Sequence, residues 1–123
     1  MLFAQYLNAS PTNTISIDPV LPSGLALSYP NESNKQPLQS EFKLLQSIFM
    51  SNRVGERWAV ITVKNTASGN RSLEHKHLMA IFADGQRHSP EPFKINVAAQ
   101  QARSITVYFG QNQFPLLVVN TAN

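Results

Sequence analysis

The chain has 123 residues, of which 42% are hydrophobic and 14% are charged, and its formal net charge is +3. This length is enough for one domain with its own hydrophobic core. The chain contains no cysteine, which excludes disulfides, thiolate metal sites, iron–sulfur clusters and thiol nucleophiles together.

The positive charge raises the question of a nucleic-acid partner. Binding to a phosphate backbone needs several cations on one surface, because each neutralised phosphate releases counterions. Here the 10 lysines and arginines are spread singly along the chain and form no run or helical stripe. No aromatic stacking motif accompanies them. We therefore expect no nucleic-acid partner.

The region 1–40 differs from the rest of the chain because it is rich in proline, asparagine and serine. Proline cannot donate to a β-ladder, so central strands are not expected there. Two alternating segments, 14–17 (TISI) and 25–29 (LALSY), are typical of short edge strands. The first ten residues lack a basic start and a long apolar run, so we expect no complete signal peptide in this chain. No apolar run approaches the roughly 20 residues of a membrane helix, so no transmembrane segment is expected.

The segment 41–50 (EFKLLQSIFM) fits two structures. A helix would place Phe42, Leu45 and Ile48 or Phe49 on one face. A strand would place Phe42, Leu44, Ile48 and Met50 on one face, interrupted only by Gln46. We favour a strand, because the residues that follow, SNRVGER, then serve as a turn into the next strand.

From residue 57 onward the sequence alternates between apolar and polar residues, which is typical of β-strands. Asp84-Gly85 is the strongest hairpin signal in the chain. With the short N-terminal segments this makes seven or eight strands, the pattern of a β-sandwich or a small barrel. We expect strands at 57–65, 73–83, 93–98, 103–110 and 114–120.

The second half of the chain also carries motifs at its strand ends and turns: WAVITVKNTASGNRSLE, FADGQRH, INVAAQQARSITVYF and FPLLVV. With these motifs, residues 58–119 resemble bacterial immunoglobulin-like domains of secreted proteins and lipoproteins. In that family a strand ending in V-x-N precedes a loop, a D-G-x turn ends the next strand, and an s-x-T-V-x-F strand follows later. This sequence has AAQQ where the family commonly has a Pro-Gly turn. The resemblance implies an extracytoplasmic, non-enzymatic domain and carries over no catalytic residue.

We therefore expect an all-β protein with an immunoglobulin-like antiparallel β-sandwich of about seven to eight strands over 41–123. A proline-rich extended region with short edge strands, 1–40, would precede it. The inward-facing apolar residues of the expected strands form the expected core. These are Ile61, Val63, Leu78, Phe82, Ile95, Val97, Ile105, Val107, Phe109 and Leu117.

All three histidines lie in the stretch 72–93. If Asp84 and Gly85 are the two turn residues, Ile81 faces His88 across the hairpin. Alternation along the strand then divides its side chains between two faces. His75, His77, Met79, Ile81 and His88 would lie on one face, and Leu78, Ala80 and Phe82 on the core face.

Two histidines at i and i+2, followed by a methionine, suggest a copper site formed by His75, His77 and Met79. His88 would lie roughly 13 Å from His77, too far to bind the same ion. The alternative is that these are solvated side chains, since charged residues on an edge strand discourage pairing with other chains. We favour the solvated interpretation and keep copper binding as an alternative.

The sequence offers no recognisable catalytic constellation. It contains no Gly-x-Ser-x-Gly elbow and no glycine-rich phosphate loop, and no two carboxylates form a close pair on one expected face. We expect a protein that is not an enzyme and that needs no cofactor, and keep an enzyme without a recognisable motif as a second alternative. The expected function is binding a protein partner, or a second copy, through sheet edges or end loops in the periplasm or at the cell surface.

Overall fold

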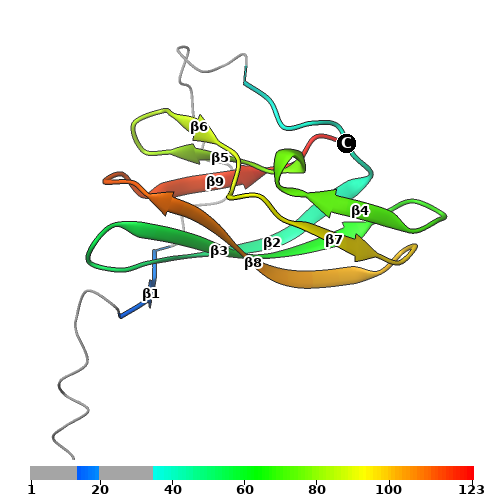
Figure 1. Ribbon diagram of the computed structural model, residues 1–123, viewed down its shortest axis with the longest axis horizontal. Coiled ribbons are helices and arrows are strands. Elements are labelled where there is room, and N and C mark those ends of the chain that lie inside the picture. The colour runs from blue at the N-terminus through cyan, green and yellow to red at the C-terminus, as the bar shows by residue number, and fades with distance from the viewer. Residues whose placement is uncertain (1–13, 20–34) are drawn as a thin grey trace, which may run out of the picture.

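The computed structural model describes residues 14–19 and 35–123. In these residues the protein is all-β, and the strands pair antiparallel (Figure 1). No helix in this part of the chain is long and apolar enough to cross a membrane. The strands are β1 (Ser16–Ile17), β2 (Phe42–Ser51), β3 (Glu56–Asn65), β4 (Arg71–Glu74), β5 (Met79–Phe82), β6 (Arg87–His88), β7 (Lys94–Val97), β8 (Ala102–Gln111) and β9 (Leu116–Asn120).

The strands form three sheets. The largest has four strands in the order β1-β2-β3-β8, and the smaller ones are β4-β7 and β6-β5-β9. Both smaller sheets lie over the same face of the four-stranded sheet (Figure 1). That face is therefore the inner one, and the opposite face, which we call the outer face, looks away from the other described strands.

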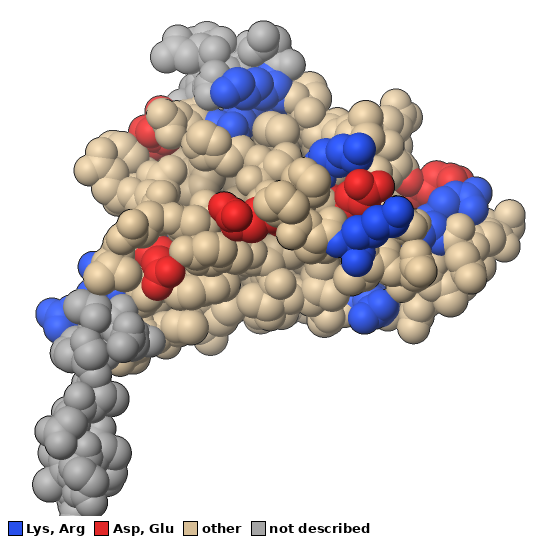
Figure 2. Space-filling view, in the orientation of Figure 1, with Lys and Arg blue, Asp and Glu red and all other residues tan. Residues whose placement is uncertain are grey.

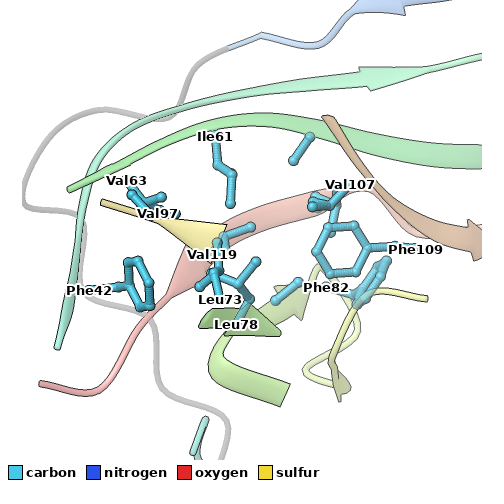
Figure 3. Packing of buried hydrophobic residues seen from close by; sticks show 13 residues of the cluster. Phe42, Ile61, Val63, Leu73, Leu78, Phe82, Val97, Val107, Phe109 and Val119 are labelled. Atoms are coloured by element: carbon cyan, nitrogen blue, oxygen red, sulfur yellow. The ribbon is translucent and has the colours of Figure 1, made fainter. Parts of the chain in front are cut away.

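The hydrophobic core lies between the large sheet and the two smaller ones. Alternation along β3 buries Ala59, Ile61 and Val63, each 0% exposed, and turns the residues between them to the outer face. From this strand Ile61 points toward Leu73 of β4 and Val119 of β9 (Figure 3). Each sheet thus buries one face against another, which is the main stabilising contribution in a domain of this kind.

Most of the expected core is confirmed, with one error. Seven of the ten residues are buried, and Ile95 and Ile105 are partly buried against the cluster. The prediction that Leu117 belongs to the core is wrong, because its neighbour Leu116 is the buried residue, at 3% exposure. The reason is an irregularity in the β5–β9 ladder, where Leu116 pairs with Phe82 and the alternation shifts by one residue.

The N-terminal expectations are confirmed in part. Residues 41–50 form a strand, since β2 runs from Phe42 to Ser51. The expected edge strand at 14–17 corresponds to β1, which pairs with the end of β2. The expected strand at 25–29 lies outside the described residues.

The single strand expected over 73–83 is wrong. It is divided into β4 and β5 by a 3₁₀ turn, His75–His77, in which the Leu78 N–H donates to the His75 carbonyl at 3.1 Å. β4 pairs with β7, whereas β5 pairs with β6 and β9, so the turn moves the chain from one small sheet to the other. The Leu38 N–H also donates to the Lys76 carbonyl at 2.8 Å, a contact from a distant segment that fixes the turn.

The expected two-residue turn at Asp84-Gly85 is also wrong. The Phe82 N–H donates to the Gln86 carbonyl at 2.9 Å, which leaves a three-residue loop. Gly85 has φ of 88°, the left-handed conformation that such loops require of their last residue. The longer loop shifts the register, so that Ala80 rather than Ile81 faces His88.

Candidate functional site

The three residues of the suggested copper site do not share a strand face. His75 and His77 lie in the 3₁₀ turn and Met79 begins β5, so the alternation that would have aligned them is absent. The His77 Nδ1 atom accepts a hydrogen bond from the Glu74 backbone N–H at 3.0 Å and is therefore already in use. Within the described residues, no group of three or more histidine, aspartate and glutamate side chains could hold a metal ion. Copper binding through two imidazoles and a thioether remains a prediction.

His77 borders a surface hollow of about 390 Å³ near the 3₁₀ turn. Arg71 Nε and Glu41 Oε1 form an ion pair of 2.7 Å beside it, so the two charges largely neutralise each other. The serines of the hollow bond elsewhere: Ser72 Oγ donates to Asn96 Oδ1, and Ser40 Oγ accepts from the Phe42 N–H. Neither hydroxyl pairs with His77 as a nucleophile pairs with its base.

The outer face of the four-stranded sheet has a more ordered arrangement. Residues directly opposite each other in an antiparallel ladder project from the same face, so the registers define rows across the strands. The first row crosses all four strands, and the other three cross β2, β3 and β8. In order along the sheet the rows are Ile17–Met50–Trp58–Tyr108, Ile48–Val60–Thr106, Gln46–Thr62–Ser104 and Lys43–Lys64–Ala102.

Polarity changes regularly along these rows. The first row is apolar and aromatic, with the Trp58 and Tyr108 rings 5.4 Å apart. The third row is polar but uncharged, and the Thr62 and Ser104 hydroxyls share a hydrogen bond of 2.7 Å. Lysines enter only in the fourth row. The outer face is therefore a broad uncharged surface with one basic end.

A carboxylate, that of Glu56, lies at the end of the outer face beside the first row, next to the β2–β3 turn that carries the exposed Arg53. The Tyr108 hydroxyl donates to Glu56 Oε2 at 2.7 Å, and Asn52 Nδ2 donates to Glu56 Oε1 at 2.8 Å. These hydrogen bonds lower the pKa of the Glu56 carboxyl and keep it ionised, and the bond from Tyr108 has the larger effect. The same bond raises the pKa of the Tyr108 phenol. Glu56 thus holds a fixed negative charge next to the aromatic pair.

β1 is attached to this sheet through Asp18. The Asp18 N–H donates to the Phe49 carbonyl at 2.8 Å, and Ser51 Oγ donates to Asp18 Oδ1 at 2.6 Å. Arg57 Nη1 lies 4.0 Å from Asp18 Oδ2, and both side chains are largely buried, at 12% and 14% exposure. These contacts hold Ile17 at the edge of the outer face, where it is 68% exposed.

Charged side chains gather elsewhere on the molecule. In the view of Figure 2 they cluster toward the end where β4 and β7 lie. Arg71–Glu41 and Lys76–Glu74 are ion pairs in that region. The contrast with the uncharged rows of the outer face shows that charge is unevenly distributed over the surface.

The outer face could not be predicted from the sequence. The composition of its first row depends on which residues of four strands stand opposite each other, and a bulge between Leu44 and Gln46 shifts that register. The one sequence feature that could have indicated this face is Trp58, the only tryptophan of the chain, because alternation along β3 places it on the side opposite the core.

Comparisons with protein-family models, with curated proteins and with solved structures found no match for this chain.

Proposed function

We propose that this protein is a non-enzymatic, extracytoplasmic accessory domain of the immunoglobulin-like β-sandwich class that binds a protein partner through its outer face. The observation that carries the proposal is the apolar row Ile17–Met50–Trp58–Tyr108, which crosses the full width of the sheet. This surface replaces the sheet edges and end loops that the sequence suggested as the binding region.

The residue types of the outer face support a protein partner. A solvent-facing side of an antiparallel sheet normally carries polar residues, and an isolated apolar side chain there needs no explanation. Here five apolar or aromatic side chains adjoin one another without an intervening charge in the first two rows on β2, β3 and β8. Tryptophan, tyrosine and methionine are enriched in protein interfaces, and charged residues are depleted at interface centres.

The class and the compartment are supported by sequence and topology together. Antiparallel sheets that share one core suit a sandwich, and residues 58–119 resemble immunoglobulin-like domains of secreted proteins. A chain with only 14% charged residues also fits such an address. Fractionation of the producing cells tests the compartment: we expect the native protein in the periplasmic or surface fraction, and recovery from the cytoplasm alone would contradict the proposal.

Site-specific photo-crosslinking tests the binding face. A photoreactive amino acid is introduced at Val60, in the second row of the outer face, and separately at Lys94, an exposed residue of β7. In the producing cells we expect a discrete protein adduct from position 60 and none from position 94. The proposal fails if position 60 gives no adduct, or if both positions give the same ones.

A further inference from the structure

We propose that the outer face binds a second copy of the same chain in an antiparallel, twofold-symmetric arrangement. This inference rests on the proposed function and names the partner of that same face. It follows from the charges at the two ends of the face, together with the uncharged rows between them.

The basic end of the outer face is uncompensated. Lys43 and Lys64 stand directly opposite each other on β2 and β3, and like charges so placed repel. Within 14–19 and 35–123, neither lysine has an ion-pair partner. A second protein that brings a carboxylate to this end would relieve the repulsion.

Glu56, at the opposite end of the outer face, supplies that carboxylate. Glu56 is bonded only to the neutral groups of Tyr108 and Asn52, and it forms no ion pair with a cation in the described part of the chain. Because the Tyr108 ring belongs to the first row, the Glu56 carboxylate lies at the outer face. The rows therefore carry a carboxylate at one end and two lysines at the other, with uncharged residues between them, and the exposed Arg53 lies in the turn beyond the carboxylate.

A surface with this polarity is complementary to itself after a half turn. With a twofold axis that lies between the two outer faces, parallel to both sheets and crossing the strands at Val60, Lys64 of each copy lies over Glu56 of the other. Trp58 then lies over Thr62 of the second copy, and Val60 meets its own equivalent. Such an isologous interface closes after two copies and forms no extended assembly.

The size of the outer face fits a weak dimer. Glu56 and Lys64 lie near the two ends of β3, so about 26 Å separates them at roughly 3.3 Å per residue. Three strands about 4.8 Å apart span this length and β1 adds a little at the first row, so the face measures roughly 400 Å² per copy and about 800 Å² for a pair. This total is below the size of stable specific interfaces, so the dimer should be weak and should dissociate on dilution.

Analytical ultracentrifugation of the full chain between about 1 and 500 µM tests the inference, since small interfaces dissociate in this range. We expect a monomer–dimer equilibrium in the wild type. Val60→Lys, which places two lysines at the axis, should abolish it. A wild type that stays monomeric throughout overturns the inference, as does a dimer that persists unchanged in Val60→Lys.

Charge reversal tests the orientation of the two copies. Lys64→Glu places like charges together across the interface and should weaken the dimer at least tenfold, whereas Lys94→Glu, the matched control on β7, should leave it unchanged. Adding Glu56→Lys to Lys64→Glu should restore the dimer. Equal effects of Lys64→Glu and Lys94→Glu, or no restoration in the double variant, would overturn the antiparallel arrangement. Circular dichroism shows whether each variant is folded.

Chemical crosslinking identifies the partner independently. The chain lacks cysteine, so Val60→Cys and the control Lys94→Cys each provide a single thiol for a short bismaleimide. We expect an adduct of twice the chain mass from the first variant only. If no such adduct forms while photo-crosslinking at Val60 captures a different protein, the second-copy inference fails and the proposed function stands.

Discussion

Asn65, the last residue of β3, is 0% exposed and satisfies its side chain entirely with backbone groups. Its Nδ2 donates to the carbonyls of Gly69, Val97 and Ala98 at 3.0, 3.1 and 3.2 Å, and its Oδ1 accepts from the Ala67 N–H at 2.9 Å. One amide thus joins the loop after β3 to the end of β7. The V-x-N pattern in the sequence indicated that a strand ends at Asn65, but it did not predict which groups the Asn65 side chain would bond.

We predict that Asn65→Ala destabilises the protein by about 2–3 kcal/mol, because buried backbone groups lose their hydrogen-bond partner. Chemical denaturation measures the change. Asn70→Ala, an exposed asparagine in the same loop, is the matched control and should change stability by less than about 0.5 kcal/mol. Similar effects from the two variants would show that the Asn65 amide does not tie the loops together.

His77 gives the protein a dependence on pH. Burial lowers the pKa of its imidazole, with smaller contributions from Lys76 and His75 in the same direction and from Glu74 in the opposite one. Protonation would also place a hydrogen on Nδ1, which accepts from the Glu74 N–H. The unfolded chain therefore binds this proton more readily than the folded protein does. The contribution of His77 to the free energy of unfolding is complete above about pH 6.5, the pKa in the unfolded chain, and is lost as the pH falls toward the lower pKa in the folded protein.

We therefore expect the free energy of unfolding to decline between about pH 7 and pH 5, with a smaller decline in His77→Gln. Denaturation at several pH values measures the slope. His75→Gln, which removes only a minor contribution to the His77 pKa, should change the slope less than His77→Gln does. An unchanged slope in His77→Gln would remove His77 as the source.

At the scale of elements, alternation predicted where strands occur better than where they end. β3 and β8 were predicted closely because β-branched residues alternate without interruption. The break in the strand after Glu74 was not predicted, because tertiary contacts such as the hydrogen bond between Leu38 and Lys76 determine it.

The segment 98–101 (AAQQ) forms a tight turn although it contains no glycine. Gln100 adopts φ of 63° and its amide donates to the Thr66 and Ala67 carbonyls, which offsets the conformational cost.

The Asp18 side chain adds two contacts to the backbone pairing of the short strand β1, and this gives an element-scale prediction. Asp18→Ala removes the contacts to Ser51 and Arg57, so the backbone amide of residue 18 should exchange with solvent at least tenfold faster. Hydrogen exchange followed by NMR measures this. The amide of Ile61, in the centre of β3, serves as the internal reference and should keep its rate. Unchanged exchange at position 18 would show that the backbone ladder alone holds β1.

For the whole molecule, the core was predictable from sequence and the candidate site was not. Burial follows the alternation of each strand separately, so Ile61, Val107 and Phe82 could be placed in the core without knowledge of their neighbours. The outer face exists only once four strands are aligned, because Met50 and Tyr108 meet Trp58 through two separate ladders. His75 and His77 suggested a site because a strand would have placed them on one face. The 3₁₀ turn replaces that strand, so they do not share a strand face.

Oxidative footprinting of Met50 and Trp58 tests most directly whether the outer face binds a protein. These residues lie on adjacent strands of the first row. Met79 at the start of β5, which lies outside the face, is the internal control. We predict that Met50 and Trp58 are oxidised at least several-fold more slowly in the producing cells than in dilute purified protein, relative to Met79. Equal relative rates in the two settings would contradict a covered outer face.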